Sequence, residues 1–393
     1  MGLSVTLQSP DVGPVYLDYN ATAPTRPEAL EATLAAMRTV GNASSTHQSG
    51  RDAADRVHLA RRQVAYLLSC SPGEIIFTSG ATEANNLALR AAFAVGGRLV
   101  TSAVEHPAVL ETAKALTIDA PGSLLTLPVD ADGAVDLDGF HAALVAGGVA
   151  VVSLMAANNE TGVLTDLAPI VQLAHDAGVL VHSDATQLVG RLPIDLAETD
   201  LDLLSLSAHK FGGPQGVGAL FVRRGIRLPY RPLLFGGGQE RGWRAGTLNV
   251  AGIAGAGAAA EAARLSMADE AFRIACLRDA LEEALVEQVG DCRINGARNR
   301  RLPGVTSITF PGTPADAVLA AMPDVAASEG SACSSGAPSP SHVLLAMGRS
   351  REEADSTIRF SLGYATTAHD IERAVSSTVH AVRLVQEAMS VAS

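Results

Sequence analysis

Short apolar runs alternate with longer segments of helical periodicity through the middle of the chain. Each run is bounded by Gly or polar residues, which is typical of a buried strand. The expected strands are residues 74–78, 99–102, 149–154, 179–181, 201–206 and 216–222. Because strands and helices alternate from about residue 74 to 222, the pattern predicts an α/β fold in which helices cover both faces of a mostly parallel sheet.

Helical periodicity marks further segments on either side of this region. Helices are expected at residues 27–37, 50–68, 83–94 and 250–289. A final amphipathic helix is expected to align one apolar stripe, formed by Ile371, Val375, Val379, Val382 and Met389.

A change in composition near residues 255–265 predicts a boundary between two domains. Residues 1–258 are expected to form the large domain, with a loose N-terminal arm at 1–15. Residues 259–393 are expected to form a smaller α+β domain, with strands near 292–294 and 305–310. A chain of 393 residues is long enough for both cores.

Composition narrows the functional classes. The net charge is −12 and the basic residues form no stripe, which argues against nucleic acid as the main ligand. No apolar stretch reaches the roughly 18 residues of a membrane span, and the first residues lack a signal-peptide pattern. The four cysteines are scattered without a Cys-x-x-Cys pair, so we expect neither a zinc site nor a disulfide framework. We therefore expect the protein to be located in a reducing cytoplasm.

Ionisable residues follow two neighbouring apolar runs. Asp184 comes after the run at 179–181, and His209 and Lys210 come after the run at 201–206. Chemistry in open α/β sheets collects beyond the carboxyl ends of the strands, so we expect a carboxylate and an amine in one crevice. A Lys among apolar residues can form a Schiff base, and pyridoxal 5'-phosphate (PLP) needs such a Lys and an acidic partner for its ring nitrogen. Taken singly, Lys210 could instead be solvated and Asp184 a helix cap.

Other strand exits carry further candidates. The small residues at 79–82 precede a helix, where free backbone N–H groups and the Thr82 hydroxyl suit a phosphate, although Thr before Glu is also an ordinary helix start. His106 occupies an equivalent position, and its imidazole could cover a planar cofactor and move protons, or cap the helix. Asn158 and Asn159 could form a turn, or one of them could bind an aromatic hydroxyl.

Cys333 differs from the other cysteines because Ser, Ala and Gly surround it in a loop. An accessible thiolate there would be a usable nucleophile, whereas Cys70, Cys276 and Cys292 fit structural positions. Arg359 lies in a candidate strand and suits bidentate capture of a carboxylate, with a surface salt bridge as the alternative. The Gly-rich residues 236–247 are interpreted as a shaped, exposed loop.

With these motifs in place, nearly the whole chain resembles the cysteine desulfurases of the PLP-dependent class V aminotransferase group. The motifs that carry the resemblance are residues 78–83 (TSGATE), 105–106 (EH), 158–160 (NNE), 184–187 (DATQ), 209–210 (HK), 244–247 (RAGT) and 330–333 (GSAC). The last resembles the subgroup with the longer Cys loop. The resemblance implies PLP-dependent fold type I and a homodimer.

The resemblance also implies roles for individual residues. Lys210 would carry PLP, His106 would stack on its ring, Asp184 would pair with the ring nitrogen, and Gln187 and Asn159 would lie on the ring hydroxyl side. The implied phosphate ligands are Ala81, Thr82, Ser207 and His209, with Thr247 from the other subunit. Arg359, with Asn159, would bind the carboxylate of L-cysteine. Cys333 would attack the substrate sulfur, leaving alanine and a persulfide for an acceptor protein.

Some positions depart from the family pattern. Ala208 stands where Gly is frequent, Gln215 where Lys is frequent, and residues 155–157 replace a segment that often carries a His. Alternatives are a selenocysteine lyase, a catalytically silent sulfur-transfer scaffold, and a class V aminotransferase without sulfur chemistry. The sequence does not identify the sulfur acceptor, which could belong to iron–sulfur cluster assembly, tRNA thiolation, or DNA or metabolite sulfuration.

Overall fold

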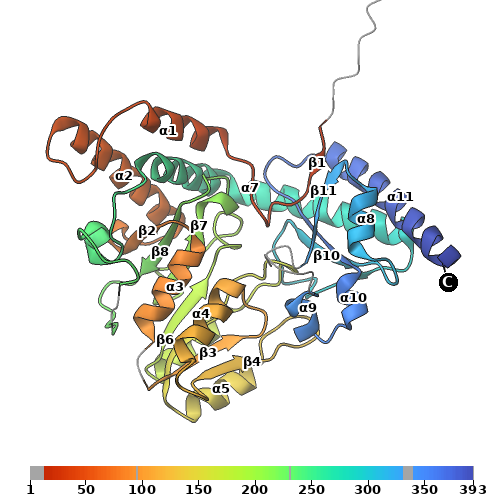
Figure 1. Cartoon of the computed structure of the whole chain (residues 1–393), viewed down its shortest axis with the longest axis horizontal. Helices are drawn as coiled ribbons and strands as arrows, with labels where there is room; N and C mark the ends of the chain where they lie inside the picture. The colour runs from red at the N-terminus through yellow and green to blue at the C-terminus, as the bar shows by residue number, and fades with distance from the viewer. Residues whose placement is uncertain (1–12, 94–95, 230–231, 331–339, 393) are drawn as a thin grey trace, which may run out of the picture.

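The computed structural model describes residues 13–93, 96–229, 232–330 and 340–392. Cys333 and most of the predicted N-terminal arm lie outside these ranges. The described part folds around two groups of sheets that one long helix, α7 (Val250–Val289), connects (Figure 1). No helix in the described ranges is long and apolar enough to cross a membrane.

A seven-stranded sheet forms the larger part, in the order β2-β8-β7-β6-β5-β3-β4. Its strands are β2 (Ile75–Thr78), β3 (Arg98–Ser102), β4 (Leu124–Leu127), β5 (Val149–Ser153), β6 (Leu180–Asp184), β7 (Leu203–Ser207) and β8 (Gly218–Val222). All neighbours are parallel except β8, which runs antiparallel to both β2 and β7. The predicted mostly parallel α/β sheet is therefore confirmed, and β4 is an addition to the predicted strands.

Helices cover both faces of this sheet because successive strand residues point to opposite sides. In β2, Ile76 packs with α3 and α4, whereas Ile75 and Phe77 pack in the core that contains α2 and the first half of α7. The helices of this part are α1 (Pro27–Met37), α2 (Gln48–Leu67), α3 (Ala81–Ala92), α4 (Pro107–Thr117), α5 (Leu137–Val145) and α6 (Leu167–Asp176). Short 3-10 turns lie at Pro72–Glu74, Ala208–Lys210 and Gln239–Gly242.

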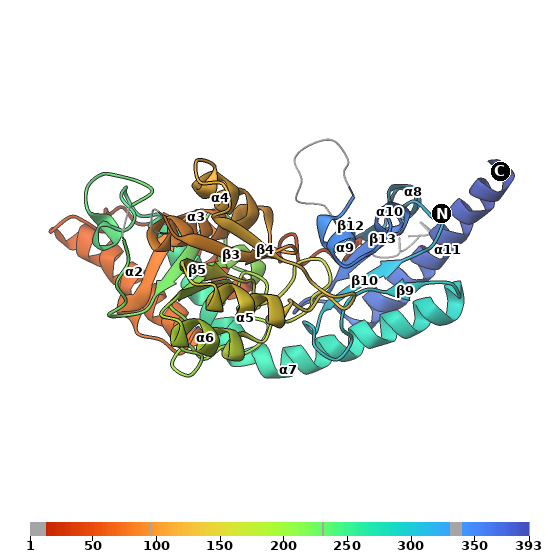
Figure 2. The ribbon, with the colours of Figure 1, turned by 90° about the horizontal axis from the view of Figure 1, so that it is seen from below.

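A smaller antiparallel sheet lies over the second half of α7, with the order β12-β13-β10-β9 (Figure 2). Its strands are β9 (Arg293–Ile294), β10 (Val305–Thr309), β12 (Ser328–Glu329) and β13 (Thr357–Ser361). The helices of this part are α8 (Ala315–Ala321), α9 (His342–Ala346), α10 (Arg351–Asp355) and α11 (Ala368–Ala392). Apolar residues of α8, α11 and the second half of α7 share a separate core with this sheet.

The start of the described chain also belongs to this smaller core. β1 (Val15–Tyr16) pairs in parallel with β11 (Val325–Ala326), and Val15 and Leu17 are buried there. The predicted division at residue 258 falls within α7, which is one continuous helix, so the domain boundary stays a prediction.

Small residues let α7 approach α1 and α2 closely. Gly255 lies against Ala29 and Thr33 of α1, and Gly257 lies against Ala60 of α2. A Cβ atom added to Gly257 would come within 2.4 Å of the Ala60 Cα. The side chain at this position must therefore be hydrogen for the helices to keep their spacing.

We expect Gly257→Ala to lower the free energy of unfolding by about 1–3 kcal/mol, because the new methyl group must displace the backbone of α2. Urea denaturation followed by circular dichroism measures the change. The propensity of Ala for a helix interior acts in the opposite direction, by about 1 kcal/mol. A more stable variant would contradict close packing at this contact.

Candidate active site

The predicted site residues gather around one cavity of about 460 Å³. The cavity lies beyond the carboxyl ends of β2, β3, β5, β6 and β7, where an open α/β sheet places its ligands. The predicted residues that line it are Ala81, Thr82, His106, Asn159, Asp184, Gln187, Ser207, His209 and Lys210. Residues from five separate strand exits thus meet at one place.

Asp184 is the last residue of β6 and is buried. Its Oδ2 accepts a hydrogen bond of 2.7 Å from Asn85 Nδ2, and its Oδ1 accepts one of 3.0 Å from the Thr186 backbone N–H. Asp184 and Asn85 both line the cavity, and the two hydrogen bonds fix the orientation of the carboxylate there. Sequence reasoning missed Asn85, and the available signal was a polar residue among the buried apolar positions of α3, one turn after Thr82.

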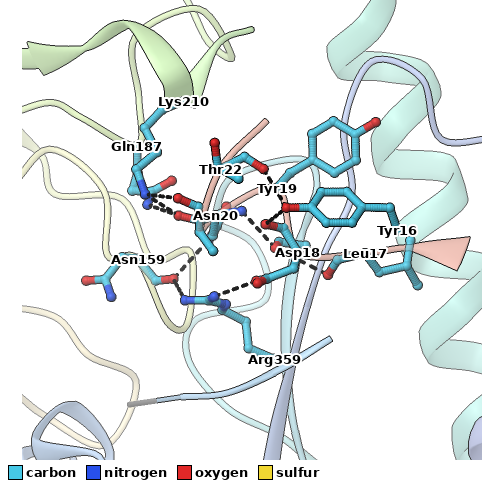
Figure 3. A network of polar contacts seen from close by, with 12 residues as sticks. Tyr16, Leu17, Asp18, Tyr19, Asn20, Thr22, Asn159, Gln187, Lys210 and Arg359 are labelled. Atoms are coloured by element: carbon cyan, nitrogen blue, oxygen red, sulfur yellow. Dashed lines mark hydrogen bonds and ion pairs between the residues drawn. The ribbon is translucent and has the colours of Figure 1, made fainter. Parts of the chain in front are cut away.

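Lys210 lies at the end of the 3-10 turn that follows β7. Its Nζ donates to the backbone oxygens of Asn20 (2.5 Å) and Ala21 (2.8 Å), and the Gln187 Nε2 donates to the same Asn20 oxygen (3.0 Å; Figure 3). The buried Asn20 therefore places two predicted site residues, yet sequence reasoning assigned it no role.

The two histidines of the cavity are neutral at physiological pH. Burial lowers the pKa of His106, and burial together with the charges of Lys210 and Arg191 lowers the pKa of His209 to about 4. The His106 Nδ1 accepts the Ala108 backbone N–H (3.0 Å), so the proton of the neutral ring is on Nε2. His106 thus caps α4 and lines the cavity at the same time.

Four buried oxygens around the cavity find no hydrogen-bond partner within the described ranges. They are Asn85 Oδ1, Asn159 Oδ1, Thr186 Oγ1 and Gln187 Oε1. A buried polar atom without a partner costs about 1–3 kcal/mol, so a polar group bound here would offset that cost. The N-terminus of α3, at Ala81 and Thr82, adds free backbone N–H groups for an anion. Oxygens that accept hydrogen bonds, together with N–H groups that donate to an anion, fit the hydroxyl and phosphate groups of PLP.

Two predicted residues do not line this cavity. Arg359 is buried in β13, where it forms an ion pair with Asp18 (2.7 Å) and donates to the Asn159 backbone oxygen (3.1 Å; Figure 3). The Arg359 side chain is buried and Asp18 is half-buried, so the salt bridge of the alternative forms, but it does not lie on the surface. Thr247 is exposed on the Gly-rich loop. The roles predicted for Arg359 and Thr247, like the role of Cys333, remain predictions.

The Gly-rich loop is held to the large part by ion pairs. Glu240 is buried and pairs with Arg61 of α2 (2.6 Å), and Arg244 pairs with Glu83 of α3 (2.9 Å). These contacts agree with the interpretation of a shaped loop. Among the departures from the family pattern, Met155 and Gln215 line the cavity, whereas Ala208 is buried beside it.

Comparison with known proteins identifies the family. The sequence profile of the aminotransferase class-V family matches residues 15–374, so the chain belongs to that family. It is 45% identical to a cysteine desulfurase of Frankia sp. (strain EuIK1), over 95% of this chain and 92% of that protein. It is 44% identical to the cysteine desulfurase IscS of Anaeromyxobacter dehalogenans (strain 2CP-C), over 95% and 94% of the two chains.

A solved structure shares the fold. The NifS-like protein of Rickettsia africae ESF-5 superposes with a TM-score of 0.85 at 34% identity, covering 94% of this chain and 99% of that chain. The family resemblance seen in the motifs and the predicted fold class are thereby confirmed.

Glu105, next to His106, is a fully buried carboxyl group. Its Oε1 accepts hydrogen bonds from Ser102 Oγ (2.7 Å) and the Met155 backbone N–H (2.9 Å), while its Oε2 finds no partner among the described residues. Burial raises its pKa to about 8, and the two hydrogen bonds oppose this shift. Glu105 is therefore mostly protonated at neutral pH and orients the Met155 backbone beside the cavity.

We expect the stability of Glu105→Gln to rise relative to wild type as the pH increases. Unfolded Glu loses its proton near pH 4.5, whereas folded Glu105 keeps it to about pH 8, so wild type loses stability as pH rises through this window. Gln carries no such proton. Urea denaturation at about pH 5 and about pH 8 should show a relative gain on the order of 1 kcal/mol or more.

The exposed Glu287 provides the matched control. Glu287→Gln should show no such drift in relative stability, because its carboxyl group is in water in both states. A difference between Glu105→Gln and wild type that stays constant over this pH range would contradict the raised pKa.

Proposed function

We propose that this chain is a PLP-dependent cysteine desulfurase that takes sulfur from L-cysteine, leaves L-alanine, and passes the sulfur to an acceptor through a persulfide on Cys333. The observation that carries the proposal is the single cavity that unites Lys210, Asp184 and His106. Membership of the class V family, and relatives named cysteine desulfurase at 44–45% identity over most of the chain, support the substrate.

The residues that would hold PLP follow from the lining of the cavity. Lys210 would bind it covalently, Asp184 would face its ring nitrogen, and His106 would cover the ring. Gln187 and Asn159, each with an unpartnered buried oxygen, would meet the ring hydroxyl side. The residues that would hold the phosphate are Ala81, Thr82, Ser207 and His209. When bound, PLP supplies an electron sink for the negative charge that develops on the substrate α-carbon.

Different side chains of the cavity have different roles in proton transfer. The Lys210 amine would act as the base at the substrate α-carbon. The neutral His106 holds a proton on Nε2 and can give it up within the cavity. Asn85 donates a hydrogen bond to Asp184 Oδ2 and thereby fixes the orientation of its carboxyl group.

Sulfur transfer falls to Cys333. Its thiolate attacks the substrate sulfur, and the S–S bond forms as the C–S bond breaks. The electron pair of the broken bond stays on the carbon, which takes up a proton and becomes the methyl group of alanine. The persulfide sulfur is then transferred to a thiol of the acceptor. Arg359 donates to the backbone oxygen of Asn159 and forms an ion pair with Asp18. It would bind the substrate carboxylate by giving up the ion pair with Asp18 and forming one with the substrate.

A homodimer forms part of the proposal. The exposed Thr247 would reach the phosphate of the other subunit, and exposed apolar side chains on α1, including Leu30, Leu34 and Met37, suit a subunit interface. Light scattering after size-exclusion chromatography tests this state. The acceptor is proposed to be a protein, and the cytoplasmic location stays a prediction.

We expect Cys333→Ala to abolish sulfide release from L-cysteine, by at least about 100-fold, while the protein stays yellow. The loss follows because the variant has no thiol to receive the sulfur, whereas the cofactor cavity is intact. Sulfide assay and the visible spectrum measure the two effects. Cys276→Ala, which changes an exposed cysteine of α7, is the matched control and should keep full activity. Full sulfide release by Cys333→Ala would refute the assigned nucleophile.

We also expect Lys210→Ala to lose covalently bound PLP and all turnover, because Lys210 is the only lysine that lines the cavity formed by the described residues. Borohydride reduction followed by peptide mass spectrometry should place the cofactor on Lys210 in wild type and on no peptide of the variant. A colourless wild type that is inactive with added PLP would favour a silent scaffold. Faster turnover of L-selenocysteine than of L-cysteine would favour a selenocysteine lyase.

A further inference from the structure

A carboxylate lies beside the turn that is proposed to hold the cofactor phosphate. Glu83, in the first turn of α3, lines the cavity together with Ser79, Ala81 and Thr82. Its Oε2 accepts the backbone N–H of Ser79 (2.8 Å), which fixes the carboxylate next to the turn. The Glu83 side chain is only 10% exposed, so water and salt screen its charge weakly. A phosphate bound at this turn would therefore have a fixed negative charge as its neighbour.

The proposed phosphate ligands offer no positive charge to oppose this carboxylate. Three of them have uncharged side chains, and the fourth, His209, is neutral because burial and the charges of Lys210 and Arg191 lower its pKa to about 4. Lys210 is the one Lys or Arg among the described residues that line the cavity, and it is proposed to bind the cofactor covalently. A phosphate monoester carries about two negative charges at neutral pH, so an unopposed Glu83 would weaken its binding.

The opposing charge comes from the Gly-rich loop. Arg244 donates its Nε hydrogen to Glu83 Oε1 (2.9 Å), and it is not among the described residues that line the cavity. Burial raises the pKa of Glu83, but the hydrogen bonds from Arg244 and Ser79 and the charge of Arg244 outweigh it, so the pKa lies below its ordinary value. Glu83 is therefore ionised, and the pair with Arg244 has no net charge only while the loop keeps Arg244 in place.

The Gly-rich loop is anchored to the strand that leads into the phosphate turn. Glu240 accepts the backbone N–H of Phe77 on the free edge of β2, and it pairs with both terminal nitrogens of Arg61 (2.6 and 2.8 Å). Glu240 and Arg241 have left-handed backbones, with φ of 48° and 58°. Residues other than Gly keep this conformation only where their surroundings hold it. The loop is thus fixed in the position that brings Arg244 to Glu83.

We propose that Arg244 is a positioning residue for the cofactor phosphate that acts through Glu83: it cancels the charge of Glu83 and so lets the turn at residues 79–82 bind an anion. The proposal rests on the function proposed above and adds that the Gly-rich loop sets the affinity for the phosphate group from outside the cavity lining. Pyridoxal, which is PLP without its phosphate, should bind independently of this pair.

The test titrates cofactor-free, full-length protein with PLP and with pyridoxal, and follows the absorbance of the bound compound. The quantity compared is the pyridoxal Kd divided by the PLP Kd, which measures the preference for the phosphate. We expect Arg244→Ala to lower this ratio about tenfold, because the carboxylate is then unopposed. Glu83→Gln should raise the ratio about threefold, because Arg244 then adds a positive charge. Gln keeps an oxygen that can accept the Ser79 N–H.

The variant that carries both substitutions separates charge cancellation from a direct contact between Arg244 and the phosphate. Its pair again has no net charge, so its ratio should return to within about twofold of wild type. Arg244→Lys keeps the positive charge and should also stay within about threefold of wild type. The matched control is Arg264→Ala, which breaks an ion pair with Glu261 (2.8 Å) at the surface of α7 and should change neither Kd.

Three outcomes would overturn the proposal. They are an unchanged ratio in Arg244→Ala, equal changes in the PLP and pyridoxal constants, which indicate a merely structural role, and a double variant as weak as Arg244→Ala, which indicates direct contact with the phosphate. If Arg244→Ala does not fold, Glu83→Gln decides, and a ratio that does not rise contradicts the proposal.

The failure of the proposed function has a different signature. If wild type binds neither PLP nor pyridoxal, the proposed function fails. Calorimetric titration of inorganic phosphate into the same proteins then decides whether the Glu83–Arg244 pair sets anion affinity. The same order of affinities, with Glu83→Gln strongest and Arg244→Ala weakest, supports this role of the pair, and any other order overturns it.

Discussion

The pairing of β6 with β7 is the constraint on which the site depends. These neighbouring parallel strands place Asp184 opposite Ser205, and the chain then continues through Ser207 to the short turn that ends at Lys210. A carboxylate and an amine separated by 26 positions in the printed sequence therefore emerge at the same edge of the sheet. Parallel strands require this, because their carboxyl ends lie side by side.

The cavity beside these residues is built at an energetic cost. Polar oxygens of Asn85, Asn159, Thr186 and Gln187 are buried around it without partners among the described residues. The surrounding apolar core and the backbone hydrogen bonds hold them in place. Folding alone would favour partners for such atoms, so their arrangement is explained by a polar ligand that completes the hydrogen bonding.

The smaller part of the molecule is tied to this cavity by a few long-range polar contacts. Arg359 of β13 reaches Asn159, and Ser341 and His342 of α9 reach the loops after β5 and β3. The continuous helix α7 belongs to both cores, so it sets the distance over which these contacts form. Small shifts of the smaller part would consequently be felt at the residues next to His106 and Asn159.

The sequence by itself determined the strand and helix alternation, the strand exits, and the residues at those exits. Periodicity and turn chemistry are local properties, so Asp184, His106 and Lys210 could be selected from residues near them in the chain. Only the tertiary structure showed three hydrogen bonds between residues far apart in the sequence. Asn85 donates to Asp184, 99 positions away, and Lys210 donates to the backbone oxygen of Asn20, 190 positions away. Ser341 donates to Glu160, 181 positions away. Such partners are chosen by strand order and helix packing, which no local pattern of residues encodes.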